Sequence, residues 1–481
     1  MLKAFLRDSA IYAIPSFLSR GLSIFLVPLY TRVLKPSDYG GLDMLLVFGN
    51  LVSLTVAFEV SQGVARYYSD EKNPDKKILY ASTAFWFTLF CYTLFLVLSL
   101  IFTPNLAKLV MGVDGLEKIF KLGMFHLWLN GLYLLIHNQF RWELRSRNYA
   151  IASILVTLVT TSIAVTLAYG LKLGLTGILV GMIAGGLVGC MYGLWYLRDT
   201  FQFRFHMAHL KEMLAFSAPL VPSGIAVFVS LYIDRLMINH YMSLDSVGLY
   251  GIGFRLAGVV GLVMVGFQGA LTPLVYAHYR EEQTPNQLAK IFRIFLTFAL
   301  LFFLGLSLFS REILWLMTTP PYYAAAHVVI YLVPATLLSS MYIFAPGIAI
   351  AKKTCLCLWI NLGGAVLNTL FNWLLIPGFG IIGAALGKLL GYSCVFTAYM
   401  CFSQRFYHVP HDWKMLGISV TGVAVLAACG SMIDMSVVID SALKLACLCG
   451  AGLFLSATGM VKWSEFEKAV ALAKQRLERT A

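Results

Sequence analysis

Five basic residues lie within stretches of sequence that are otherwise apolar. One of them, Lys444, lies near the outer end of its stretch, and the other four are Arg20, Arg235, Arg255 and Lys388. A cation at the centre of a membrane helix costs roughly 2.5 to 3.5 kcal/mol on insertion scales, so such residues commonly mark a substrate path. Arginine keeps its charge and donates two parallel hydrogen bonds to a phosphate, whereas lysine acts as a mobile point charge. These side chains are therefore predicted to line a cavity and bind an anionic headgroup, for which a pyrophosphate is a natural ligand.

The alternative is that each of these cations is paired internally or extends to a membrane interface. Arg235 has a candidate partner in the adjacent Asp234. Two further carboxylates, Asp43 and Glu59, lie near the two ends of the second apolar stretch and are candidates for coupling to a cation or proton.

Two asparagines, Asn368 and Asn372, are four residues apart and share one helix face. This face is predicted either to contact the sugars of a substrate or to join neighbouring helices. No Walker loop, metal-spaced His/Cys cluster or nucleophile elbow occurs in the sequence. We therefore expect a protein that is not an enzyme, with no cofactor and no bound metal, whose transport uses an ion gradient, the membrane potential or the gradient of the substrate itself.

The elements that position these residues are membrane helices. Of the 481 residues 59% are hydrophobic and only 12% are charged, a balance that a water-soluble domain could not cover with polar surface. Since one crossing takes about 20 apolar residues, the sequence predicts an all-α polytopic membrane protein with about 14 transmembrane helices. The predicted spans are 9–31, 40–65, 79–102, 120–140, 150–170, 174–197, 214–238, 247–273, 291–309, 326–350, 355–376, 380–402, 415–433 and 441–461.

The net charge of +13 fits basic residues in cytoplasmic loops better than a nucleic-acid partner. Most of the 36 Lys and Arg residues fall in alternate segments between the spans. This bias predicts that both termini are cytoplasmic.

A glycine pattern recurs in the second half of the sequence. Gly174, Gly177, Gly181 and Gly185 have the spacing of Gly380, Gly383, Gly387 and Gly391. Pro15-Ser16 and Pro222-Ser223 recur at nearly the same offset, which predicts two six-helix lobes in a parallel repeat. The predicted regions are an N-terminal lobe (1–205), a C-terminal lobe (206–405), two additional helices (406–461) and a cytoplasmic amphipathic helix (462–481).

Loose motifs at corresponding places in the two halves resemble the polysaccharide (Wzx-type) flippases of the multidrug/oligosaccharidyl-lipid/polysaccharide exporter superfamily. The motifs are Phe17 to Arg20, Val27 to Leu34, Ser37 to Gly40, Ala218 to Pro222, Tyr232 to Arg235, Val247 to Tyr250 and Asn368 to Gly391. The resemblance implies alternating access around a cationic cavity. It also implies transfer of undecaprenyl-pyrophosphate-linked oligosaccharide to the periplasmic leaflet during O-antigen, capsule or exopolysaccharide biosynthesis. Membrane lipids, a polysaccharide polymerase and a chain-length regulator are the expected partners.

One departure and two alternatives accompany this resemblance. The related lipid II flippases carry an Arg-Asp pair in the first helix, whereas Gly21 follows Arg20 here, which puts a peptidoglycan precursor in doubt as substrate. A cation-coupled multidrug antiporter of the same superfamily is one alternative, and would depend on Asp43 or Glu59. A non-transporting scaffold of a polysaccharide assembly complex is the other.

Overall fold

The computed structural model describes residues 26–431 and 437–460, and a few side chains within these ranges are not described. Among these residues the chain is helical and contains no strand. Arg20, most of the first predicted span and the predicted amphipathic helix 462–481 lie outside the described residues, as do parts of the last two predicted spans.

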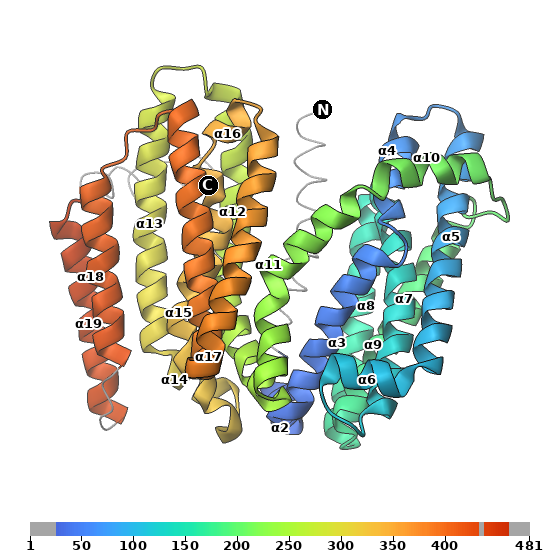
Figure 1. The fold of residues 1–481 in the computed structure, drawn as a ribbon, viewed down its shortest axis with the longest axis horizontal. Coiled ribbons are helices and arrows are strands. Elements are labelled where there is room, and N and C mark those ends of the chain that lie inside the picture. Colours follow the sequence, from blue (N-terminus) through green and yellow to red (C-terminus); the bar gives the residue numbers. More distant parts are fainter. Residues whose placement is uncertain (1–25, 432–436, 461–481) are drawn as a thin grey trace, which may run out of the picture. The chain divides into compact units, whose positions relative to one another are not determined.

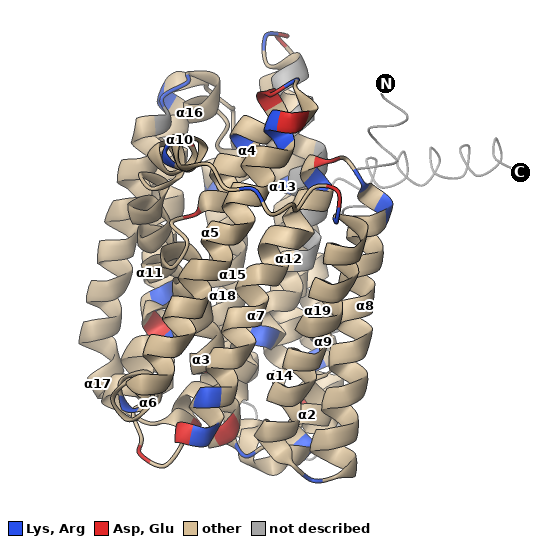
Figure 2. Cartoon of the chain, turned by 90° about the vertical axis from the view of Figure 1, so that its right-hand side faces the viewer, with Lys and Arg blue, Asp and Glu red and all other residues tan. Residues whose placement is uncertain are grey.

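Ten described helices are long and apolar enough to cross a membrane, or up to eleven when one bent pair is counted as a span. Charged residues gather near helix ends and connecting segments, while the middle sections of the helices carry few charges (Figure 2). The chain is therefore a multi-pass membrane protein. The count of 14 and the orientation of the termini stay predictions.

The chain divides into two compact units. Unit 1 comprises residues 1–252, 317–322 and 372–384, and unit 2 comprises residues 253–316, 323–371 and 385–481. These units do not coincide with the regions predicted from the repeat, and the predicted lobe boundaries stay a prediction.

Unit 1 is built mainly from the helices before residue 242. They are α2 (Val27–Val33), α3 (Pro36–Thr55), α4 (Val60–Asp70), α5 (Pro74–Ile101), α6 (Thr103–Met111), α7 (Glu117–Trp142), α8 (Ser146–Val165), the π-helical turn η1 (Thr166–Gly170), α9 (Gly174–Tyr196), α10 (Met207–Ser217) and α11 (Leu220–Tyr241). Helices α5, α7, α8 and α9 run side by side, and α10 packs on α4 and α5 (Figure 1). Helices α3 and α4 meet at a bend of 48°.

Local sequence explains where these helices begin. Pro74 occupies the first turn of α5, where its missing N–H costs nothing, and the side chain of Asn73 accepts a hydrogen bond from the Asp75 N–H at 2.9 Å. Large apolar side chains such as Phe85, Leu129 and Phe140 then form the core between α5, α7 and α9. Capping residues thus set where these helices begin, and their apolar faces determine how the helices pack.

Helix α12 (Leu244–His278) passes from unit 1 into unit 2. The remaining elements are α13 (Thr284–Leu308), α14 (Ser310–Met317), the 3-10 turn η2 (Pro320–Ala325), α15 (Ala326–Ser340), η3 (Met341–Phe344), α16 (Gly347–Ile350), α17 (Thr354–Phe406), α18 (Trp413–Ser431) and α19 (Val437–Ala457). Within unit 2, α13 packs against α15, α18 and α19 (Figure 1).

Helix α17 is a helical hairpin and not one straight helix. Gly380 has φ 57° and ψ −136°, a conformation that breaks the helix, and Pro377 precedes it. A Cβ on Gly383 would lie 2.3 Å from the carbonyl oxygen of Leu375, and one on Gly364 would lie 2.1 Å from a methyl of Val395. Positions on the two sides of Gly380 thus face one another, as the two separate spans predicted at 355–376 and 380–402 require.

The same arrangement occurs at the first copy of the glycine pattern. Gly174 also has a positive φ, 55°, and it begins α9. A Cβ on Gly177 would lie 2.6 Å from the Ala168 nitrogen, and one on Gly181 would lie 2.6 Å from the Ala164 nitrogen. Both glycine patterns therefore permit close packing of two antiparallel helices, which accounts for their shared spacing.

Candidate substrate-binding site

Lys388 and Arg255, two of the predicted headgroup ligands, lie on elements of unit 2 that meet. Lys388 on α17 is 2% exposed, and its Nζ lies 4.7 Å from the centroid of the Phe254 ring on α12. A desolvated cation over an aromatic face gains about 2 kcal/mol, which offsets part of the cost of burial. Arg255 follows Phe254 in the chain and is partly exposed. The structure thus places the Lys388 ammonium against the residue that precedes Arg255 on α12.

Arg235 lies in a buried ion-pair cluster in unit 1. Its Nε donates to Asp43 Oδ2 at 2.6 Å, and its Nη1 lies 3.7 Å from Asp234 Oδ1. The guanidinium also lies 5.6 Å from the ring centroid of Tyr232 and 5.8 Å from that of Tyr250. The Tyr250 hydroxyl donates to Asp234 Oδ2. Arg235 therefore meets Asp234, the partner that the alternative interpretation named, and also Asp43, which the sequence did not offer as its partner. Its contact with a headgroup stays a prediction.

This cluster joins α11 to α3 close to a tight helix crossing. A Cβ on Gly40 would lie 1.9 Å from the carbonyl oxygen of Leu244, and one on Gly248 would lie 2.0 Å from that of Pro36. Because Gly40 and Gly248 have only a hydrogen atom in place of a Cβ, the backbones of α3 and the start of α12 are in direct contact. The ion pair and the two glycines thus fix the same junction.

The two candidate coupling carboxylates have different surroundings. Asp43 is engaged by Arg235. Glu59 lies at the bend between α3 and α4 in a left-handed conformation with φ 52°. It lines a cavity of about 190 Å³ together with polar side chains that include Gln62, Thr88 and Asn138. Of the two, Glu59 has the surroundings of a polar site that water or an ion can enter.

The predicted asparagine face is buried. Asn368 is 2% exposed and packs against Gly391 across the α17 hairpin, where a Cβ on the glycine would lie 3.0 Å from the Asn368 Cβ. Asn372 is 0% exposed. Both placements agree with the helix-joining interpretation, while sugar contact stays a prediction.

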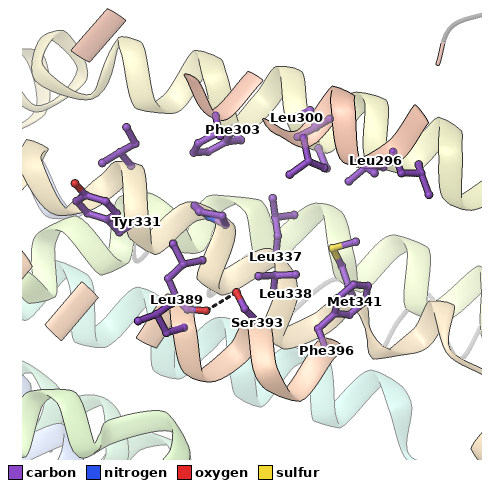
Figure 3. A pocket seen from close by; sticks show the side chains of 18 of the residues that line it. Leu296, Leu300, Phe303, Tyr331, Leu337, Leu338, Met341, Leu389, Ser393 and Phe396 are labelled. Carbon is purple, nitrogen blue, oxygen red and sulfur yellow. Dashed lines mark hydrogen bonds between the residues drawn. The ribbon is translucent and has the colours of Figure 1, made fainter. Parts of the chain in front are cut away.

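One feature that the sequence did not predict is an apolar cavity within unit 2. Its volume is about 690 Å³, and α13, α15, α17 and α18 line it. Figure 3 shows Leu296, Leu300 and Phe303 of α13 facing Leu337, Leu338 and Leu389 across the space. Two of the labelled residues, Tyr331 and Ser393, have hydroxyls, and that of Ser393 donates to the Leu389 carbonyl at 2.7 Å. We call this space the apolar groove.

Sequence reasoning missed the groove because apolar side chains are expected throughout membrane helices. The available signal was the additional pair of helices after residue 406, since α18 supplies one wall of the groove.

Comparisons with known proteins agree with a transporter fold. A family profile described as "Polysaccharide biosynthesis protein" matches residues 29–319. A probable low-salt glycan biosynthesis flippase of Haloferax volcanii is 21% identical over 230 residues, which is 45% of this chain and 47% of that protein. The matched region thus spans about half the length of this relative.

Solved structures resemble most of the chain. A lipid II flippase, MurJ, in an inward closed conformation has a TM-score of 0.71 at 14% identity, covering 93% of this chain and 98% of the other. An inward-facing multidrug resistance transporter of the MATE family has a TM-score of 0.66 at 14% identity, covering 83% of this chain and 97% of the other. The predicted all-α polytopic fold is confirmed as one that both kinds of transporter share.

Proposed function

Because the chain belongs to the polysaccharide biosynthesis protein family, as its sequence motifs predicted, we propose that it is a flippase for lipid-linked oligosaccharide. It transfers undecaprenyl-pyrophosphate-linked oligosaccharide from the cytoplasmic to the periplasmic leaflet of a bacterial inner membrane by alternating access. The route serves O-antigen, capsule or exopolysaccharide biosynthesis, with a polymerase and a chain-length regulator as downstream partners.

The apolar groove carries this proposal. A lipid-linked substrate has a long hydrocarbon chain, and the groove offers it about 690 Å³ lined mostly by apolar side chains, with hydroxyls on Tyr331, Ser393 and Ser431. A polar solute would gain nothing from such a surface. The groove therefore favours a substrate with a lipid tail over a small polar one.

The basic residues supply the complementary site for the head. Lys388 and Arg255 lie on neighbouring elements, and we propose that they bind the pyrophosphate together with Arg20. A pyrophosphate balances two or three positive charges, which lowers the cost of holding them in the membrane. Arg235 is a less direct candidate, because Asp43 and Asp234 already balance its charge.

The chemistry required of these residues is binding and release. The proposed cycle exchanges water around the pyrophosphate for fixed cations and breaks no covalent bond, which agrees with the expectation that the protein is not an enzyme. Glu59 is the proposed proton or cation site, because it lies in a polar cavity at a strained bend.

Deletion of the gene tests the proposal. We expect lipid-linked oligosaccharide to accumulate on the cytoplasmic leaflet, with the polymerase and chain-length regulator still assembled. Dispersal of that complex would instead favour the scaffold alternative. Unchanged lipid-linked intermediates together with increased drug sensitivity would favour the multidrug antiporter.

A further inference from the structure

Three exposed basic residues lie at one end of the α17 hairpin, in unit 2. Lys352 and Lys353 directly precede its first helix, and Arg405 is in the last turn of its second helix. Lys353 Nζ lies 4.4 Å from the centroid of the Phe406 ring, so this ammonium contacts the residue that follows Arg405. Arg405 Cζ lies 5.6 Å from the ring centroid of Phe402. The two ends of the hairpin thus bring the three cations to one surface, which we call the basic face.

The backbone beneath the basic face is tightly joined. A Cβ on Gly347 would lie 2.2 Å from the carbonyl oxygen of Ser403, and the Gly347 N–H donates to the Ser403 hydroxyl at 2.8 Å. The N–H of Lys353 donates to the Ile348 carbonyl at 3.1 Å, which fixes the turn that leads into α17. The backbone of the basic face is therefore held in place before any ligand binds, which lowers the entropic cost of binding.

Carboxylates are missing from the sequence around the basic face. Between Glu312 and Asp412, a stretch that includes the whole hairpin, the sequence contains no Asp or Glu. Among the described residues none of the three cations forms an ion pair. Of the acidic residues on adjoining segments, Asp412 caps the first turn of α18, Glu281 Oε1 lies 4.0 Å from His278 Nε2, and Glu282 is exposed. No carboxylate of the described chain is thus paired with the basic face.

The basic face lies where the membrane spans of the hairpin end. The sequence predicts spans at 355–376 and 380–402, so Lys352 and Lys353 directly precede one span and Arg405 follows the other. Trp359 is 67% exposed and lies about 9 Å further along the first helix than Lys353. Tryptophan is enriched at the boundary between the hydrocarbon core and the headgroups. This placement favours a ligand from the headgroup layer over one from bulk water.

We propose that the basic face binds the headgroup of an acidic phospholipid, for which phosphatidylglycerol is the simplest probe. The two lysines approach the phosphate as point charges, and Arg405 can donate two parallel hydrogen bonds to it. Basic clusters at the cytoplasmic ends of membrane helices attract acidic lipids, and the charge bias of the sequence predicts this end to be cytoplasmic. The ligand is a resident lipid of the bilayer and not the transported molecule, so this inference does not depend on the proposed function.

A lipid bound in this way would act on the hairpin as a whole. It would bridge the start of the first helix and the end of the second, through Lys353 and Arg405. The same hairpin carries Lys388, the buried cation of the proposed headgroup site. Because a ligand that binds only the folded state stabilises it, the acidic lipid should raise the melting temperature of the protein.

Binding to the purified full-length protein in detergent tests this proposal, measured by native mass spectrometry and by thermal melting. The probes are phosphatidylglycerol, phosphatidylethanolamine, undecaprenyl phosphate and inorganic phosphate. In the test variant each of the three residues of the basic face is replaced by Gln. The matched control removes the same number of charges from exposed positions in unit 1, by Lys118→Gln, Lys121→Gln and Lys172→Gln.

We expect the test variant to bind phosphatidylglycerol roughly tenfold more weakly than the unaltered protein, because three attractive charges are lost. The control variant should bind it with unchanged affinity. A charge-preserving variant, Lys352→Arg with Lys353→Arg, should also retain binding. Phosphatidylethanolamine, which has no net charge, should bind every variant alike. Melting without added lipid separates loss of binding from loss of folding.

Three results would overturn the proposal. The test variant could bind phosphatidylglycerol as tightly as the unaltered protein, or phosphatidylethanolamine could raise the melting temperature as much as phosphatidylglycerol does. Undecaprenyl phosphate or inorganic phosphate could also displace phosphatidylglycerol at equal concentration, which would assign the basic face to the substrate or to a soluble phosphate. Failure of the proposed function would leave these outcomes unchanged, since none of them measures transport.

Discussion

Replacing Arg235 by Met tests whether the buried cluster is held together by charge. Arg235 is 4% exposed and lies between two carboxylates, Asp43 at 2.6 Å and Asp234 at 3.7 Å. Met has a similar length and no charge, so this change leaves both carboxylates buried without their cation. Asp43→Asn is the complementary change, which leaves Arg235 beside Asp234.

The two changes should differ in magnitude. Breaking a buried pair so that a charge is left uncompensated costs about 3 to 5 kcal/mol. Arg235→Met is expected to lower the free energy of unfolding by an amount in this range, because two carboxylates lose their partner. Asp43→Asn removes one charged hydrogen bond and keeps the Asp234 pair, so it should cost about 1 to 3 kcal/mol. The double variant should be more stable than Arg235→Met alone, since one unpaired carboxylate has been removed.

Equilibrium unfolding of the purified variants in mixed micelles measures these differences. Lys108→Gln is the control, because the Lys108–Asp114 pair is at the surface with side chains 66% and 76% exposed. An exposed pair contributes at most about 1 kcal/mol. The reasoning is refuted if Asp43→Asn destabilises more than Arg235→Met, or if adding Asp43→Asn to Arg235→Met lowers stability further.

Three further expectations follow from the packing, the loop and the bend. Gly383→Ala should destabilise the protein by about 1 to 3 kcal/mol, because its Cβ would meet the Leu375 carbonyl. Gly363→Ala on the same element has open space around its Cβ and should stabilise the protein by about 0.5 to 1 kcal/mol. Equal shifts in melting temperature for the two variants would contradict this expectation. Burial and, to a smaller extent, the nearby His408 lower the pKa of His411 to about 4. The unfolded chain therefore binds this proton first, and stability should fall as pH drops from about 6.5 to 4. His411→Gln should reduce that loss in melting curves recorded across this range, and an unchanged pH dependence would oppose the assignment. Glu59→Gln should slow export in cells with normal protein levels, and export at the original rate would exclude Glu59 as the coupling site.

The fold class was predictable because bilayer helices obey simple rules of length and apolar composition. The repeated glycines were also informative, because Gly174 and Gly380 both begin the second helix of a tight hairpin. The helix ends near Gly380 were also predictable, because glycine readily adopts the positive φ that ends one span there and starts the next.

The partners of individual charges were less predictable. The sequence named Asp234 as a partner of Arg235, whereas Asp43 comes from a distant helix and only folding brings it within 2.6 Å. The apolar groove was missed because a lining of Leu and Phe looks the same in sequence as a lipid-facing surface. Distances between residues far apart in the chain depend on packing that no local pattern encodes.

Lys388→Ala tests the central claim most directly, with the sidedness of lipid-linked oligosaccharide measured in spheroplasts by its accessibility to an external sugar-modifying enzyme. The account predicts normal amounts of folded protein and intermediates that accumulate on the cytoplasmic leaflet, beyond the reach of the enzyme. If the intermediates reach the periplasmic leaflet at the original rate in the Lys388→Ala, Arg255→Ala and Arg20→Ala variants alike, the proposed headgroup site is wrong.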